Sequence, residues 1–125
     1  ILVDFHAEAT SEKLGMGYFL DGKVSAVFGT HTHVQTADER VLPGGTAFIS
    51  DLGCCAAQNS MLGMNTDIIL QRLLTQMPQK FAVEHNPPYT LHGICLTVDT
   101  TTGKATAIER IKVLDTDLRV GSLQE

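Results

Sequence analysis

The sequence predicts an α/β fold with a mixed sheet, and three observations carry this prediction. Short apolar runs at residues 1–5 and 24–28 flank a segment with helical spacing, which is typical of a strand–helix–strand unit. A second amphipathic segment begins at Asn65 or Thr66 and stops at Pro78, as a surface helix does. The last third of the chain alternates apolar and polar residues, which indicates antiparallel strands.

The first half supplies the elements of the predicted mixed sheet. Thr10 or Ser11 is expected to cap a helix that runs to about Leu20, because both side chains are good caps. A Pro-Gly-Gly turn at 43–45 separates two short strands, of which the second is residues 46–50.

The second half combines a loop, a helix and a late antiparallel region. Residues 53–64 show no clear period and are predicted to form a long loop, a type of segment that often carries function. The helix that follows has an apolar face and is stopped by proline. The predicted late strands are residues 81–83, 89–98 and 105–114, with a hairpin turn at 99–103.

Composition limits the classes of protein. The chain has 125 residues, 43% of them hydrophobic, which suits one modest domain. A net charge of −5 argues against nucleic acid as a partner, because no basic stripe displaces counterions, although metal cations let an acidic chain bind a phosphate. No apolar stretch approaches the ~20 residues of a membrane span, so a membrane partner is not expected. The cysteines Cys54, Cys55 and Cys95 form no even disulfide framework, which favours a reducing, cytoplasmic location.

Three histidines follow two of the predicted strands. His6 ends the first strand, and His31 and His33 lie in a Gly-Thr-His-Thr-His phrase directly after the second. Ligand sites of open α/β sheets collect at the carboxyl ends of strands, and neutral imidazole is the commonest metal ligand in proteins. We therefore predict that these histidines bind metal, either as one catalytic zinc site or as part of a two-metal site.

A two-metal site also needs carboxylate oxygens. Asp4 alternates with His6 on the first strand and is expected on the same side. Glu8 is a candidate to orient an imidazole from outside the ligand set. The candidate carboxylates are Asp4, Glu8, Asp38 and Asp51.

Other reactive residues carry less information. His85 and His92 lie in or beside the late strands without polar company, so we expect ordinary structural roles. Cys54 and Cys55 are a less favoured redox or nucleophilic pair, since no neighbouring charge lowers their pKa in the sequence. No Ser-based nucleophile motif or glycine-rich phosphate loop is present.

The histidine phrases resemble a known family. Residues 4–13 and 29–38 resemble a bacterial branch of the calcineurin-like metallophosphoesterases, described as hydrolysing 2′,3′-cyclic nucleotides and related phosphodiesters. The similarity continues more thinly into the late strands. Further matching segments are residues 42–47, 50–53, 62–64 and 108–110.

The resemblance implies a fold and a metal centre. The fold is a four-layer α/β/β/α sandwich, of which residues 1–125 are the C-terminal half of a single domain without the N-terminal half. The centre holds two divalent or mixed-valence metal ions, iron or manganese in most members and zinc as an alternative. By analogy, His6 and His31 serve one ion and His33 the other. The general-acid histidine belongs to earlier family segments, so this chain carries no catalytic residue of its own.

The function implied is metal-dependent hydrolysis of a small phosphodiester by the complete protein, with the isolated chain inactive. One alternative is a structural or binding fragment that holds one metal ion or none. Another is a relative of the capsule-synthesis group, whose histidine phrase is similar. Ala56 and Ala57 replace a Gly-Pro of the family, which puts substrate contacts of that loop in doubt. Apolar strands at a sheet edge also favour a homo-oligomer.

Overall fold

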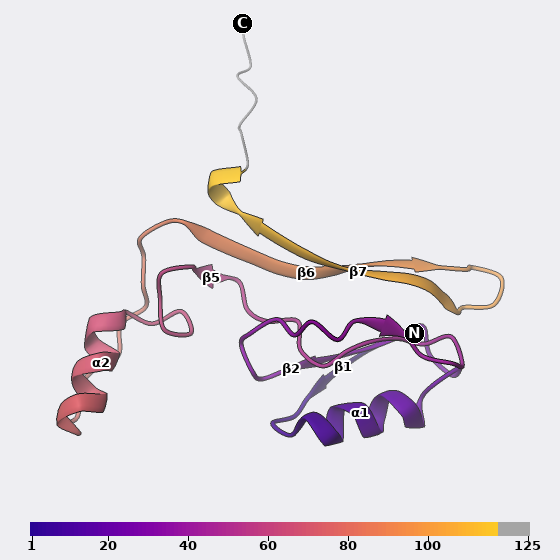
Figure 1. Cartoon of the computed structure of the whole chain (residues 1–125), viewed down its shortest axis with the longest axis horizontal. Coiled ribbons are helices and arrows are strands. Elements are labelled where there is room, and N and C mark those ends of the chain that lie inside the picture. Colours follow the sequence, from indigo (N-terminus) through magenta and orange to yellow (C-terminus); the bar gives the residue numbers. More distant parts are fainter. Residues whose placement is uncertain (118–125) are drawn as a thin grey trace, which may run out of the picture. The chain divides into compact units, whose positions relative to one another are not determined.

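The computed structural model describes residues 1–117 and contains the predicted mixture of parallel and antiparallel strands (Figure 1). None of the helices in these residues is long and apolar enough to cross a membrane. The elements are β1 (Leu2–His6), α1 (Thr10–Phe19), β2 (Ala26–Thr30), β3 (Arg40–Val41), β4 (Ala47–Ile49), β5 (Ala56–Ala57), α2 (Thr66–Thr75), β6 (Tyr89–Val98), β7 (Ala105–Leu114) and the short 3-10 helix η1 (Asp115–Asp117).

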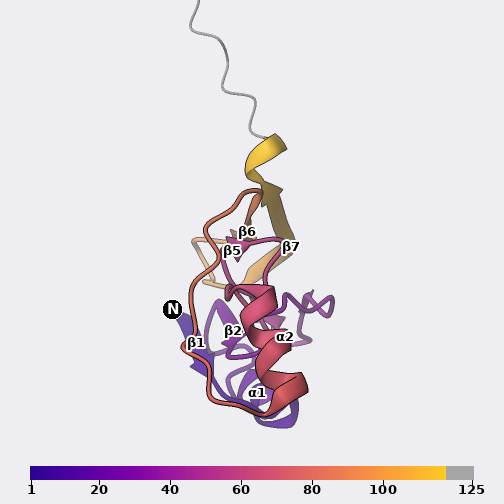
Figure 2. The same cartoon turned by 90° about the vertical axis from the view of Figure 1, so that its left-hand side faces the viewer.

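A first compact unit comprises residues 1–54 and 92–111. Its sheet has the order β1-β2-β4-β3, in which β1, β2 and β4 are parallel and β3 is antiparallel to β4. Helix α1 lies against one face of this sheet (Figure 2). Val27 of β2, Phe48 of β4 and Leu42, which follows β3, form a buried cluster against which apolar side chains of α1 pack. The predicted mixed sheet is confirmed.

The opposite face of the same sheet packs against the late strands. Ala26, Ala47 and Ala105 form a second buried cluster, joined by Leu96 of β6 and Ile108 of β7. Small side chains here let the two sheets approach closely. The first unit therefore has the layer order α/β/β, as expected for part of an α/β/β/α sandwich.

Two local predictions for this unit need correction. The N-cap of α1 is Ala9, which has no side-chain cap bond, so the predicted capping by Thr10 or Ser11 is wrong. Strand β2 runs two residues later than predicted, because its parallel pairing with β1 continues until His6 stands opposite Thr30.

A second unit comprises residues 55–91 and the stretch from residue 112. Here α2 begins as predicted at Asn65, whose side chain accepts the Ile68 N–H at 3.3 Å, but no residue of this helix is buried. The predicted strand at 81–83 is wrong: only Val83 forms an isolated bridge, with Met64. Strands β6 and β7, most of whose residues belong to the first unit, match their predicted bounds, and the hairpin turn between them is closed by the Asp99 N–H to Lys104 O bond at 2.9 Å.

Candidate metal centre

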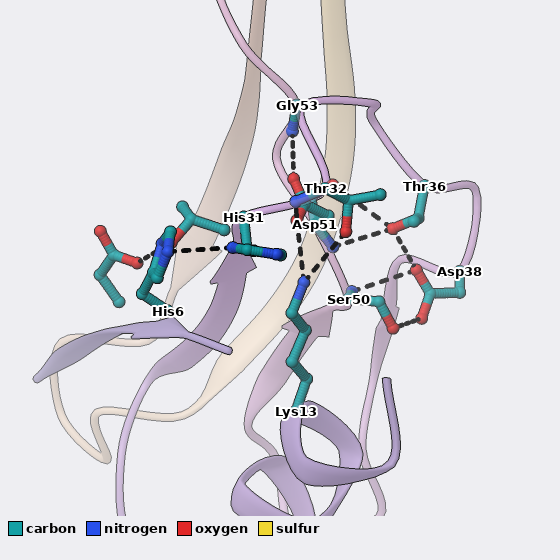
Figure 3. A network of polar contacts seen from close by, with 11 residues as sticks. His6, Lys13, His31, Thr32, Thr36, Asp38, Ser50, Asp51 and Gly53 are labelled. Carbon is teal, nitrogen blue, oxygen red and sulfur yellow. Dashed lines mark hydrogen bonds and ion pairs between the residues drawn. The ribbon is translucent and has the colours of Figure 1, made fainter. Parts of the chain in front are cut away.

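The parallel pairing of β1 and β2 brings two of the predicted ligands to one edge of the sheet. His6 is the last residue of β1, and His31 follows the last residue of β2, Thr30. The register pairs His6 with Thr30, so the two strands end side by side. Figure 3 shows the imidazoles of His6 and His31 facing each other in front of this edge.

Hydrogen bonds fix which nitrogen of His6 is available to a ligand. The hydroxyl of Thr30 donates its single proton to Asp4 Oδ1 at 3.1 Å. Its oxygen can then only accept, so His6 Nδ1 is the donor in their 3.0 Å contact. In the neutral imidazole, Nε2 then carries the lone pair, and this atom lies on the side of the ring that faces His31. Asp4, a candidate carboxylate, thus acts on His6 through Thr30 in this structure.

The geometry of the two imidazoles fits a shared metal ion. His6 Nε2 and His31 Nδ1 are 3.2 Å apart, and the rings meet edge to face with their centroids 5.0 Å apart. Two nitrogens that bind one ion at about 2.0–2.1 Å, with roughly 90–110° between the bonds, lie about 2.8–3.4 Å apart. Both side chains are exposed, so an ion can reach them.

His33, the third predicted ligand, is not part of this pair. Its side chain is exposed and makes no hydrogen bond within the described structure. Among residues 1–117, no three His, Cys, Asp or Glu side chains lie close enough together to hold a metal ion. His6 and His31 alone are brought together, and the full ligand set stays a prediction.

The loop that carries these histidines has an unusual backbone. The φ angles of His31 and His33 are 113° and 65°, a region that residues with a Cβ rarely adopt. Such conformations cost on the order of 1–3 kcal/mol each and persist only where surrounding contacts hold them.

Buried contacts beneath this loop hold its backbone in this conformation. Asp51, predicted as a possible metal ligand, instead pairs with Lys13 Nζ at 2.8 Å, and both side chains are at most 2% exposed. Asp51 Oδ2 also accepts the Thr32 N–H at 2.8 Å, and Oδ1 accepts the Gly53 N–H at 2.8 Å. Both oxygens of Asp51 therefore accept hydrogen bonds inside the protein, and the buried carboxylate is turned toward Lys13 and Thr32, away from the exposed histidine pair (Figure 3).

Asp38 is engaged in a similar way. Its carboxylate accepts from the Thr36 hydroxyl at 2.6 Å and from both the N–H and the hydroxyl of Ser50. Thr36 Oγ1 also accepts the backbone N–H of Asp51 at 2.9 Å, so this hydroxyl links the Asp38 carboxylate to the main chain at Asp51. Glu8, the remaining candidate, is exposed.

The carboxylates of the buried Asp51 and the half-buried Asp38 both have lowered pKa values. Burial raises the pKa of Asp51, but the hydrogen bonds from Lys13 and from the Thr32 and Gly53 N–H groups outweigh it and leave the pKa below 3.8. Burial likewise raises the pKa of Asp38, and the bonds from Ser50 and Thr36 bring it below 3.8.

Lys13 is the residue that sequence reasoning missed. Lys13 lies on α1, one helical turn before Gly17, and these two residues are the buried ones of the helix. A lysine on the covered face of a helix is rarely buried without a partner. The position of Lys13 on the helix could therefore have indicated that it is buried and paired. No sequence pattern indicated that its partner is Asp51, 38 residues later.

The remaining histidines have structural surroundings. His92 Nδ1 lies 2.8 Å from the carbonyl oxygen of Cys54 in the first unit. His85 is exposed in the second unit, where its N–H donates to Glu84 Oε1 at 3.0 Å. Neither lies in the contacts that surround His6 and His31.

The fold and the paired histidines define an α/β protein with a candidate metal centre at the carboxyl edge of its parallel strands. Residues 1–111 match the family described as YmdB-like protein. The chain therefore belongs to the YmdB-like family, which confirms the resemblance to the bacterial cyclic-nucleotide phosphodiesterase branch.

Individual relatives agree with this assignment. The chain is 50% identical over 115 residues to a Bacillus subtilis protein named 2′,3′-cyclic-nucleotide 2′-phosphodiesterase, covering 92% of this chain and 43% of that protein. A crystal structure of a hypothetical protein from Thermus thermophilus is 39% identical, with a TM-score of 0.82 over 90% of this chain and 44% of that one. One described as a novel phosphatase from Mycoplasma pneumoniae is 38% identical, with a TM-score of 0.82 over 90% and 40%. The chain thus spans less than half the length of these relatives.

Proposed function

We propose that this chain supplies metal ligands to a phosphodiesterase that hydrolyses small phosphodiesters of the 2′,3′-cyclic nucleotide class. The observation that carries the proposal is the convergence of His6 Nε2 and His31 Nδ1 at 3.2 Å. It occurs at a strand edge in a chain that is 50% identical to a protein named for this activity. The substrate class comes from that name, and the histidine geometry supports metal-assisted chemistry.

Within this proposal, the residues of the chain have distinct tasks. His6 and His31 hold one ion and His33 a second, with iron or manganese as the expected metals and zinc as the alternative. When bound, a pair of metal ions stabilises both the attacking and the leaving oxygen at phosphorus. Thr30 and Asp4 keep His6 Nδ1 protonated, so that Nε2 is the ligating atom.

The protonation of the leaving oxygen is assigned to a residue outside this chain. A candidate general acid must lie within hydrogen-bond reach of that oxygen, and the family places this histidine in earlier segments. Because the chain spans 43% of the Bacillus relative, the proposal concerns the native protein that carries this sequence. We place that protein in the cytoplasm, in agreement with the odd cysteine count.

A second candidate function is favoured by the separate position of His33. A chain in which only His6 and His31 converge could bind a single ion and serve as a binding or structural module. Equilibrium metal content separates the two functions, because two ions per native protein fit the phosphodiesterase and one ion or none fits the module.

Substitution of the histidines tests the proposal directly. In the native protein, we expect His31→Ala and His33→Ala each to weaken Mn²⁺ binding by about tenfold or more and to abolish hydrolysis of a 2′,3′-cyclic nucleotide. His85→Ala is the matched control, because this histidine is exposed and lies in the other unit. Full metal occupancy and an unchanged rate in either ligand variant would refute the proposal.

A further inference from the structure

The Lys13–Asp51 pair lies directly beneath the histidine loop. Lys13 Nζ and Asp51 Oδ2 are 2.8 Å apart, with the two side chains 2% and 1% exposed. A buried ion pair adds little net stability over well-packed apolar side chains, because desolvation offsets its Coulomb attraction. The role of this pair therefore depends on the groups of the loop to which it is hydrogen-bonded.

Both members of the pair contact the same loop residue. Asp51 Oδ2 accepts the Thr32 N–H at 2.8 Å, and Lys13 Nζ donates to Thr32 Oγ1 at 3.3 Å. Thr32 stands between His31 and His33 in the chain, so the pair holds the peptide that joins the two predicted ligands. Hydrogen bonds to charged groups are roughly twice as strong as neutral ones, which suits an anchor for a loop with two positive φ angles.

A glycine makes room for this arrangement. A Cβ at Gly29 would lie 1.8 Å from Ser50 O and 2.7 Å from Lys13 Cδ. Only glycine lets the strand end pass over the lysine chain at this distance. The C-terminal end of β2, at Gly29, and the loop after it, at Thr32, thus both lie against Lys13.

From these contacts we propose that Lys13 and Asp51 are positioning residues for the metal centre. Through Thr32 they fix the backbone at His31 and His33, and they set the affinity for metal without touching it. This inference rests on the proposed function, since it assumes that the two histidines are ligands. It extends that function to a buried pair from α1 and the end of β4.

Paired variants separate positioning from simple stabilisation. Lys13→Met with Asp51→Leu removes both charges together, so that no unpaired charge remains buried. Lys13→Met with Asp51→Asn keeps one carbonyl oxygen that can accept the Thr32 N–H. We expect the first double variant to bind Mn²⁺ about 10–100-fold more weakly than the wild type, and the second to recover much of that affinity.

The measurement is Mn²⁺ affinity of the native protein by competition with a chelating dye, at a temperature where circular dichroism shows every variant folded. Leu42→Ala is the stability control, because Leu42 is buried in the core cluster with Val27 and Phe48. We expect it to lower the melting temperature and to leave the Mn²⁺ affinity unchanged. Thr32→Val is a milder variant that removes only the hydroxyl contact to Lys13 and should weaken binding less than the first double variant.

The outcomes distinguish this inference from the proposed function. If His31→Ala weakens Mn²⁺ binding but both double variants bind as tightly as the wild type, the positioning role is wrong and the metal proposal stands. If His31→Ala leaves binding unchanged, the metal proposal itself fails. Equal loss in both double variants and in Leu42→Ala would also refute positioning, because affinity would then follow stability alone.

Discussion

The two units of the chain differ in how they use apolar residues. In the first unit, Phe48, Ile49 and Val27 are at most 1% exposed, and the sheet is covered on both faces. In the second unit, α2 has no buried residue, and Leu73 and Leu74 are 63% and 83% exposed. The comparison shows that a periodic apolar pattern predicts that a helix forms, whereas it does not tell whether another element covers that helix.

Replacing one large side chain in each unit gives the largest contrast. We expect Phe48→Ala to lower the free energy of unfolding of the native protein by about 3–5 kcal/mol, because the ring is fully buried. Leu74→Ala should change it by no more than about 0.5 kcal/mol. Urea denaturation measures both values. A large loss for Leu74→Ala would show that a partner element covers α2 in the native protein.

Two glycines of α1 test the packing of the first unit within one helix. A Cβ at Gly17 would lie 2.6 Å from Phe48 Cδ2, whereas a Cβ at Gly15 meets nothing within 4 Å. Gly17→Ala should therefore destabilise the protein by about 1–3 kcal/mol. Gly15→Ala should stabilise it by up to about 1 kcal/mol, because alanine has the higher helix propensity. Thermal melts of the two variants should shift in opposite directions, and a shared direction would contradict the packing described for α1.

The polar network of the first unit predicts a dependence on pH. The pKa of Asp38 is lower in the folded protein than its unfolded value of 3.8, so its ionised form stabilises the fold above that pH. This contribution is lost as the pH falls below 3.8 through the folded pKa. We expect Asp38→Asn to cost about 1.5 kcal/mol at pH 7 and progressively less below pH 3.8. Urea denaturation across this range measures the difference, and a constant cost would refute the role of the carboxylate charge.

The smallest expected effect concerns the start of α2. The Asn65 side chain accepts the Ile68 N–H, so Asn65→Ala should cost about 1 kcal/mol. Thr10→Ala is the counterpart in the first unit, where α1 has no side-chain cap, and it should be nearly neutral. Hydrogen exchange of the first-turn amides compares the two helix starts. Similar effects at both positions would contradict the observed difference in capping.

Sequence reasoning predicted what depends on local pattern. The alternation of apolar and polar residues predicted strands β6 and β7, and turn residues predicted the hairpin turn at 99–103. The Asn65 side chain predicted the cap of α2. The sequence also placed His6 and His31 at one sheet edge, since parallel strands end together.

Apart from the cap of α1 and the strand at 81–83, the differences concern contacts between distant segments. The extension of β2 to Thr30 depends on its register with β1, and the exposure of α2 depends on what packs against it. The sequence also did not indicate that Asp51 pairs with Lys13, which lies 38 residues away. A pairing across that separation leaves no periodic trace in a single sequence.

If His31 is the metal ligand proposed above, its φ angle of 113° makes tolerance of heat and metal binding opposing requirements at this position. Glycine adopts this conformation without steric cost. In the absence of metal, a protein with glycine at position 31 would therefore have a free energy of unfolding higher by about 1 kcal/mol or more. A directed-evolution library selected only for survival of heating would accordingly enrich glycine there and discard the imidazole. A library selected for turnover would keep histidine and tolerate the strain, because the bound ion contributes its own stabilisation.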